Sequence, residues 1–439
     1  MSHELTPDLA RAIHLAVRES ARDAVDLLST LVRIPSENPQ LTGREPMEEA
    51  RCQDVIAQRL KTLGLAVDRF DALPGRPDVI GRAPGSHGGR SLLFNGHVDV
   101  VPAGDPADWR YPLFAGTIAD GCVWGRGACD MKGGLVAAIT AIAALGRAGI
   151  DLAGGLVVQS VVDEETGGPG TRAAIARGPT ADAAICVEPT DLKLMPVEGG
   201  LEWVRIVVRG VAGHAALRYR SIHAGGGAPA INAIEKMAKI LAAIQDLERE
   251  WAIRKRHPLL PAGITTINPG VMLGGSGGGV DGRPNITTAV ATLPDYCSLE
   301  LDLKYLPTET QEDVKAEFER FIAHVAATDP WLAEHPPEIA WGIRGVSFPP
   351  AATPPDHPLI QTLARETAAV TGARADIIGF VAVSDIAWLA GAGIPCTLFG
   401  PGQADFAHAV DERIPIDDLL RGAEILARTA ATWCGMGSD

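Results

Sequence analysis

Histidine and acidic residues occur at five places in this sequence, and their types match the ligands of a two-metal centre. They are His97, Asp130, Glu165, Glu188 and His408. Two divalent ions held about 3.5–4 Å apart need one shared carboxylate and roughly two further ligands each. The five residues supply that number, and Glu164 remains as a general base. The sequence therefore predicts two-metal hydrolytic chemistry.

The local context of these residues favours a common site. His97, Glu164 and Glu188 each stand at or just after an apolar, β-branched run, and α/β sheets place ligands at the carboxyl ends of strands. Residues i and i+2 of a strand share a face, so Asp99 can accept a hydrogen bond from His97 and fix its tautomer. Asp130 lies between glycines in a tight loop, where a short carboxylate can bridge two ions.

The elements that must position these residues indicate an α/β fold with a largely parallel sheet, because continuous apolar strands alternate with helices. In the first 198 residues we expect strands at 66–70, 78–83, 91–100, 155–162 and 182–188, and helices at 8–33, 46–63, 133–147 and 171–177. After residue 347 we expect helices at 358–371, 384–392 and 416–434, an apolar segment at 377–383 and a strand at 396–402. Both parts belong to one catalytic domain, 1–198 with 347–439.

Residues 199–346 change in character and predict a second, inserted domain. Strands are expected at 201–210, 264–273, 297–306 and 337–343, and helices at 229–254 and 310–328. This β-α-β-β-α-β order is typical of a ferredoxin-like α+β domain. The glycine-rich run at 274–279 is expected to be a flexible loop near a cleft.

Composition narrows the class of protein. A chain of 439 residues with 46% hydrophobic and 21% charged residues predicts a soluble, two-domain protein. A net charge of -15 argues against a nucleic-acid partner, which would favour a basic surface. No apolar stretch reaches the roughly 18 residues of a membrane span, and the N-terminus lacks the apolar region of a signal peptide. Seven dispersed cysteines without a CxxC pair predict reduced thiols and a cytoplasmic location.

Together these motifs resemble the dinuclear zinc hydrolases of acetylornithine deacetylase, succinyl-diaminopimelate desuccinylase, aminoacylase and carboxypeptidase G. The resemblance runs from LVRIPSENP at 31–39 to AHAVDERIPIDDL near the C-terminus, and it depends on the combined order and spacing of the motifs. It implies that His97 and Glu188 hold one ion, that Glu165 and His408 hold the other, and that Asp130 bridges them.

The resemblance also implies roles outside the ligand set. Glu164 would be the general base, Asp99 would orient His97, and the peptide bond after Asp130 would be cis. The inserted domain would be a lid and would form a homodimer, in which His214 reaches the partner's active site and stabilises the oxyanion. The two ions would be zinc, although carboxylate and imidazole ligands also accept cobalt and manganese.

Candidate substrate contacts are less tightly defined. Asn285 resembles an asparagine that contacts substrate across the dimer, and Gly400 and Gly402 belong to the matching FGPG motif. Lys304 stands where many relatives have arginine. Three arginines are, like Lys304, candidates for binding a substrate carboxylate: Arg218, Arg220 and Arg283.

These expectations lead to one main function and several alternatives. The main prediction is a metal-dependent deacylase that cleaves an N-acyl amino acid or a similar small amide. The alternatives within hydrolases are a dipeptidase or carboxypeptidase, and a deformylase or amidase that acts on a small heterocyclic amide. A metal-binding scaffold without catalysis is disfavoured because every ligand and the base are present.

Overall fold

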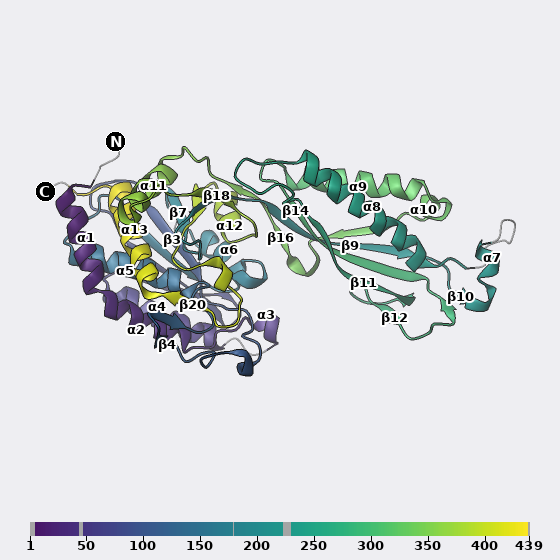
Figure 1. Ribbon diagram of the computed structural model, residues 1–439, viewed down its shortest axis with the longest axis horizontal. Coiled ribbons are helices and arrows are strands. Elements are labelled where there is room, and N and C mark those ends of the chain that lie inside the picture. Colours follow the sequence, from purple (N-terminus) through teal and green to yellow (C-terminus); the bar gives the residue numbers. More distant parts are fainter. Residues whose placement is uncertain (1–4, 44–46, 179, 223–229, 438–439) are drawn as a thin grey trace. The chain divides into compact units, whose positions relative to one another are not determined.

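The computed structural model describes residues 5–43, 47–178, 180–222 and 230–437, and the chain divides into two units (Figure 1). Unit 1 consists of residues 1–197 and 351–439, and unit 2 of residues 198–350. The chain returns to unit 1 four residues later than predicted, because a short strand, β16 (Ser347–Phe348), pairs within unit 2. Residues 46 and 229, where two predicted helices begin, lie outside the described residues.

A nine-stranded sheet forms the centre of unit 1. In spatial order its strands are β1 (Ala66–Leu73), β2 (Arg76–Ala83), β6 (Leu156–Val161), β3 (Leu92–His97), β7 (Ala183–Cys186), β19 (Cys396–Leu398), β8 (Leu194–Glu198) and β17 (Ala351–Ala352), with β18 (Ile377–Phe380) beside β8. The four central strands, β6, β3, β7 and β19, run parallel to one another. The flanking pairs β1 with β2, β2 with β6 and β19 with β8 are antiparallel. The predicted α/β class is confirmed, and the sheet is parallel at its centre.

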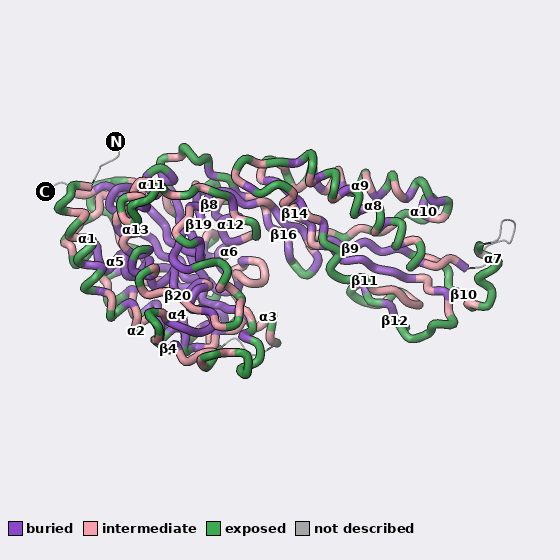
Figure 2. The backbone as a smooth tube through the Cα atoms, in the orientation of Figure 1, coloured by how far each residue is buried: buried purple, intermediate pink, exposed green. Residues whose placement is uncertain are grey.

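The central strands are buried along their whole length, as the tube coloured by burial shows (Figure 2). This explains why they appear in the sequence as continuous apolar runs and not as alternating ones. The unit 1 helices are α1 (Pro7–Glu19), α2 (Ala21–Val32), α3 (Pro39–Thr42), α4 (Met47–Thr62), α5 (Lys132–Arg147), α6 (Pro169–Ala176), α11 (Pro358–Thr371), α12 (Ile386–Gly391) and α13 (Ile416–Cys434). Helix α5 packs between β3 and an outer layer of α1, α2 and α13.

Two details of the helices bear on the site. The helix predicted at 8–33 is in fact two helices, because the Ser20 hydroxyl donates to the Ala16 carbonyl (2.8 Å) and the chain bends there. Gly134 in the first turn of α5 lies so close to the end of β7 that a Cβ would be 1.7 Å from the Val187 carbonyl oxygen. Glycine at this position therefore lets α5 begin directly beside the strand that leads to Glu188.

A three-stranded sheet that the sequence did not predict lies beside the main one. It consists of β4 (Thr117–Ala119), β5 (Cys122–Trp124) and β20 (Arg413–Pro415), with β5 in the middle. Strands this short carry too few residues to show a period of two. Their pairing nevertheless joins a segment before residue 130 to one after residue 408.

Unit 2 has the predicted ferredoxin-like arrangement. Its elements are β9 (Gly200–Arg209), β10 (Gly213–His214), α7 (Tyr219–Ile222), α8 (Ala233–Arg254), β11 (Ile267–Gly278), β12 (Pro284–Ile286), β13 (Thr292–Leu293), β14 (Tyr296–Tyr305), α9 (Gln311–Ala327), α10 (Pro330–Glu334) and β15 (Glu338–Trp341). The antiparallel sheet has the order β12-β11-β14-β9-β15. Alternate residues of β9 and β14 form the core with α8 and α9, which lie over one face of the sheet (Figure 1).

The glycine run at 274–279 was predicted to be a flexible loop, and this prediction is wrong over 274–278. These residues extend β11 and pair with β14, and from Ser276 with β12. A Cβ at Gly274 would lie 2.4 Å from the Ile234 side chain, and one at Gly275 would lie 2.2 Å from the Ile286 carbonyl oxygen. Close packing on both sides of the strand, not flexibility, therefore explains the glycines.

Candidate functional site

Four of the predicted residues lie at the carboxyl ends of three neighbouring strands in the centre of the unit 1 sheet. His97 is the last residue of β3, Glu164 and Glu165 begin a single 3-10 turn after β6, and Glu188 comes two residues after β7. Strand β3 lies between β6 and β7 and runs parallel to both. The carboxyl ends of the three strands therefore meet and bring these side chains together.

Asp130 and His408 come from two loops that the small sheet holds together. The Asp130 loop follows β5, and His408 precedes β20, which pairs with β5. Between them, Glu412 Oε1 accepts hydrogen bonds from the backbone amides of Cys129 (2.8 Å) and Asp130 (3.0 Å), and Oε2 accepts one from Arg126 (2.7 Å). Arg126 also donates to the His408 carbonyl (3.2 Å). This buried ion pair fixes both loops.

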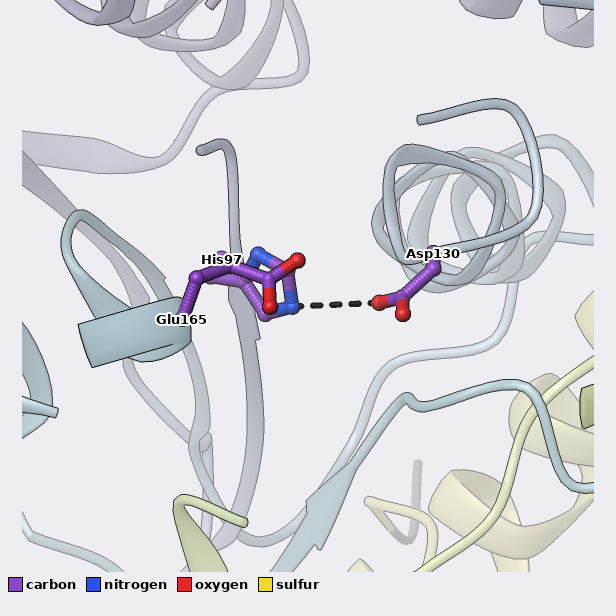
Figure 3. A group of neighbouring side chains, drawn as sticks. All are labelled: His97, Asp130 and Glu165. Atoms are coloured by element: carbon purple, nitrogen blue, oxygen red, sulfur yellow. Dashed lines mark ion pairs between the residues drawn. The ribbon is translucent and has the colours of Figure 1, made fainter. Parts of the chain in front are cut away.

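The five predicted ligands converge, with Asp130 in the middle. Its Oδ1 lies 3.3 Å from Nε2 of His97, and its Oδ2 lies 3.2 Å from Nε2 of His408. Nε2 of His97 is also 3.6 Å from Glu188 Oε1, and Nε2 of His408 is 3.2 Å from Glu165 Oε2. Figure 3 shows the side chains of His97, Asp130 and Glu165 close together. The site thus has two halves, each with one histidine and one glutamate, and a carboxylate between them.

The electrostatics of the site indicate a shortage of positive charge. Burial, reinforced by neighbouring carboxylates, raises the pKa of the glutamates at 164, 165 and 188. Burial lowers the pKa of His97, but the hydrogen bond to Asp130 and the charge of Glu188 outweigh it and leave that pKa well above its usual range. Hydrogen bonds to Asp130 and Glu165 raise the pKa of His408 to about 10. Negative charge therefore dominates this cluster, which favours the binding of a cation.

The spacing and chemistry of these donors fit divalent metal ions. Ligand bonds of about 2.0–2.2 Å around a tetrahedral ion separate neighbouring donor atoms by roughly 3.3–3.6 Å. The four donor separations within the two halves are 3.2–3.6 Å. In addition, Oε1 of Glu165 is buried without a hydrogen-bond partner among the described residues. Such an atom is costly to bury unless a cation binds it.

Asp99 serves the site in a different way from the one predicted. Nδ1 of His97 lies 2.9 Å from the Asp99 backbone carbonyl oxygen and 3.6 Å from its carboxylate. The carbonyl therefore favours the tautomer in which Nδ1 of His97 carries the hydrogen. The lone pair of Nε2 is then available to bind a metal ion. The carboxylate instead accepts hydrogen bonds from the backbone amides of Glu164 (3.2 Å) and Glu165 (3.3 Å). Asp99 thus fixes both the first histidine and the turn with the two glutamates.

Glu164 lies beside the ligand cluster without a position in either half. Its Oε2 is 3.9 Å from Nε2 of His97, and its side chain is 12% exposed. The preceding residue, Asp163, has a left-handed backbone (φ 66°) that turns the chain sharply after β6. The peptide bond between Asp130 and Met131 is cis, as the family resemblance implied.

Packing accounts for the two glycines that were candidate substrate contacts. Gly400 and Gly402 are both buried. A Cβ at Gly400 would lie 2.5 Å from the Glu188 carbonyl oxygen, and one at Gly402 would lie 2.7 Å from the Cys129 sulfur. Both glycines therefore let the loop after β19 approach the loops that hold Glu188 and Asp130.

The remaining candidates lie in unit 2. His214 is exposed on β10, Asn285 is exposed on β12, Arg283 is exposed just before β12, and Lys304 is partly buried on β14. Two further arginines are already engaged, since Arg218 pairs with Glu235 and Arg220 donates to the Tyr219 hydroxyl (3.1 Å).

Several residues that build the site were missed in the sequence. Glu412 and Arg126 hold the two loops. Lys132 is fully buried and donates to the carbonyls of Leu31 and Ile34 (2.9 Å each) at the end of α2. The available signal was their position within the recognised motifs, but charged residues in loops are more often exposed.

Comparisons with known proteins identify a family and several relatives. The family model described as peptidase family M20/M25/M40 matches residues 93–432. N-formyl-4-amino-5-aminomethyl-2-methylpyrimidine deformylase from Halalkalibacterium halodurans is 36% identical over 427 residues, which cover 95% of this chain and 96% of that protein. Succinyl-diaminopimelate desuccinylase from Gluconacetobacter diazotrophicus is 28% identical over 430 residues, or 94% and 97% of the two chains. An M20 family metallo-carboxypeptidase from Sulfolobus solfataricus superimposes with a TM-score of 0.70 at 17% identity, over 94% and 99% of the two chains.

The family match covers residues 93–432 and so includes all five converging residues, and the alignment with the first of these relatives covers 95% of the chain. They confirm the resemblance that the motifs suggested. The chain belongs to peptidase family M20/M25/M40 and is an enzyme that hydrolyses amide bonds.

Proposed function

We propose that the site holds two divalent ions, with His97 and Glu188 on one, Glu165 and His408 on the other, and Asp130 between them. The observation that carries this proposal is that each oxygen of Asp130 faces a different histidine, at 3.3 and 3.2 Å. We propose zinc as the metal, with cobalt or manganese as possible substitutes, because imidazole and carboxylate ligands suit all three.

The residues around this centre suit amide hydrolysis. Two divalent ions supply a water of lowered pKa and polarise the amide carbonyl. Glu164 would take the proton from that water and deliver it to the departing nitrogen, acting first as base and then as acid. Its burial and its distance of 3.9 Å from His97 support this role, because it lies next to the ligands without belonging to either half. The products would be a carboxylic acid and an amine.

His214 is our candidate for stabilising the oxyanion. Its Nδ1 accepts a hydrogen bond from the Ala216 amide (3.0 Å), so the proton of the neutral imidazole is on Nε2. Its exposed side chain can therefore present an N–H donor to a developing negative charge. We propose that it does so in a partner subunit, with unit 2 as lid and dimerisation domain. Exposed apolar side chains on unit 2 support such an interface: Val271, Met272, Val280, Ile286 and Val290.

For the substrate, we propose a formamide of a small heterocycle, N-formyl-4-amino-5-aminomethyl-2-methylpyrimidine. The support is the 36% identity to a deformylase of that compound over nearly the full length of both chains. A second observation agrees with it. The buried cations of unit 1, Arg76, Arg126 and Lys132, each have at least two protein acceptors, so a substrate carboxylate would compete with these contacts.

Deacylation of an N-acyl amino acid remains the second candidate, supported by the desuccinylase relative. The seven cysteines are thiols in the part of the chain that the structure describes. Reduced thiols are typical of a reducing compartment, and we propose the cytoplasm. Among the described residues, the structure contains no helix suited to spanning a bilayer.

A substrate comparison tests the assignment. The purified enzyme is loaded with zinc, cobalt or manganese and assayed with the formyl-aminopyrimidine, with N-acetyl and N-succinyl amino acids, and with dipeptides. We expect kcat/KM for the formamide to exceed the other values by at least about 100-fold, because a site built for one small acyl group rejects larger ones. Equal or faster turnover of an N-acyl amino acid would decide for the second candidate.

A substitution in unit 2 tests the oxyanion role. His214→Ala is expected to lower kcat by about 10²–10³-fold, the usual cost of removing one oxyanion donor, with metal content unchanged. His257→Ala is a matched control, since its Nδ1 likewise accepts a hydrogen bond from the amide two residues on (Leu259, 3.2 Å), and it should leave kcat unchanged.

Mixed dimers of His214→Ala and Glu164→Gln subunits should regain part of the activity, because one of their two sites has both an intact Glu164 and an intact His214 from the partner. A mixture as inactive as its parents would exclude action across the dimer.

A further inference from the structure

Two residues of β2 contact the end of β6, where the chain turns toward Glu164 and Glu165. Strand β2 is antiparallel to β6, with Val79 opposite Ser160. Asp78 Oδ1 accepts a hydrogen bond from the Val162 amide (3.0 Å). Arg76, two residues earlier, extends beyond the last paired residue of β6 and reaches Asp163. The first residues of β2 therefore fix the two residues that follow β6, Val162 and Asp163.

The Arg76 guanidinium binds two carboxylates, those of Glu49 and Asp163. Its Nε and Nη2 donate to the two carboxylate oxygens of Glu49 on α4 (2.6 and 2.7 Å). Its Nη1 lies 2.6 Å from Asp163 Oδ1. All three side chains are at most 6% exposed. The planar guanidinium can bind one carboxylate with two nitrogens and still direct the third at another, so Arg76 ties Asp163 to a helix in the protein interior.

Asp163 in turn connects this ion pair to the candidate site. Its carboxylate also accepts hydrogen bonds from the side chains of Asn38 (2.9 Å), Gln40 (2.7 Å) and Thr166 (2.8 Å). Asn38 donates as well to the carboxylate of Asp99 (2.7 Å), which accepts the amides of Glu164 and Glu165. The turn is therefore held at its start by the side chain of Asp163 and at its amides by Asp99.

The backbone of Asp163 needs this support. A left-handed conformation is unfavourable for most residues with a Cβ, and aspartate adopts it where its side chain forms local hydrogen bonds. Such conformations persist where the surroundings fix them. Without Arg76, the Asp163 carboxylate would keep only the neutral donors Asn38, Gln40 and Thr166. Its left-handed backbone would then be held less firmly and would be free to relax. That relaxation would change the direction in which the next two glutamates leave the strand.

We propose that Arg76 is a positioning residue whose ion pair with Asp163 sets the orientation of Glu164 and Glu165 toward the metal centre. The inference rests on the proposed roles of these two glutamates. The side-chain partners of Arg76 are Glu49 and Asp163, so it would act on the two glutamates through Asp163.

The sharpest test is Arg76→Lys, which keeps the positive charge but replaces the planar fork of three nitrogens by one. A single ammonium nitrogen cannot reproduce the two-nitrogen contact with Glu49 and also occupy the position beside Asp163. We expect kcat to fall about 10–100-fold with KM changed less than threefold, and the affinity for the more weakly held ion to fall at least tenfold, as for other groups that orient metal ligands. Metal affinity is measured by competition with a chelator, without substrate. Asp163→Asn removes the same ion pair from the other side and should show the same pattern. It serves as the test if Arg76→Lys folds poorly.

Arg428→Lys is the matched control. Arg428 on α13 pairs with the buried Glu366 on α11 (3.0 Å) in the same unit, so the variant should lower Tm without changing kcat or metal affinity. If Arg76→Lys and Asp163→Asn lower Tm but keep kcat within twofold and metal affinity at the wild-type level, Arg76 is merely structural and the inference is wrong. A wild-type enzyme that binds two ions but hydrolyses none of the test amides would refute the proposed function alone, because the change in metal affinity would still decide the role of Arg76.

Discussion

Replacing Glu164 by Gln is expected to lower kcat by about 10²–10⁴-fold, the range found for loss of a general acid or base, while both metal ions remain bound. Glutamine has nearly the same shape but cannot accept and return a proton at neutral pH. Because Glu164 occupies neither half of the ligand cluster, its loss should leave the ligands in place. The measurement is kcat on the preferred amide together with metal content per protein.

The neighbouring residue gives the contrast for this experiment. Glu165→Gln changes a proposed ligand, 3.2 Å from Nε2 of His408, and should lose metal together with activity. Excess metal in the assay should restore part of the activity of Glu165→Gln and none of that of Glu164→Gln. If Glu164→Gln keeps more than a tenth of the wild-type kcat, the base is another residue.

The sequence was sufficient for residues whose position follows from local patterns. His97, Glu164 and Glu188 follow continuous apolar runs, and a buried parallel sheet forces such runs because both of its faces are covered. Once the strands are placed, their carboxyl ends must meet. The fold class and the convergence of these residues were therefore accessible before the structure.

The sequence did not predict residues whose burial depends on a partner far along the chain. Arg126 and Glu412 are 286 positions apart and form a buried pair, as do Arg76 and Glu49 across 27 positions. In the sequence each is an ordinary charged residue, which is exposed far more often than buried. Only the tertiary structure shows that each charge finds its counter-ion in the interior.

The glycine run at 274–279 shows the opposite limitation. Composition alone suggested a loop, because glycine weakens strands by its backbone freedom. In the structure the run continues β11, and the space that side chains would need is filled by Ile234 and the backbone of β12. A close approach between strand and neighbours thus leaves the same signal in a sequence as a flexible linker.

The loss of metal is expected to be largest for Asp130→Asn. Both oxygens of Asp130 are used, one 3.3 Å from Nε2 of His97 and the other 3.2 Å from Nε2 of His408. Asparagine offers one neutral oxygen and places an N–H group where the other oxygen stood. Changes to groups that merely orient a ligand cost about 10–100-fold in metal affinity, so removal of a shared ligand should cost more than that. We expect at most one ion per subunit and kcat below a thousandth of the wild-type value.

The stoichiometry distinguishes a shared ligand from an ordinary one. Glu188→Gln changes a residue in only one half of the site, 3.6 Å from Nε2 of His97, and should weaken one ion and leave the other at wild-type affinity. Asp130→Asn should weaken both, because each half loses anionic charge when the carboxylate becomes an amide. Calorimetric titration of the metal-free variants with zinc or cobalt gives the number of bound ions and the affinity of each. If Asp130→Asn bound two ions as tightly as the wild type, the carboxylate between the two histidines would not be a bridge, and a two-metal centre built around it would be excluded.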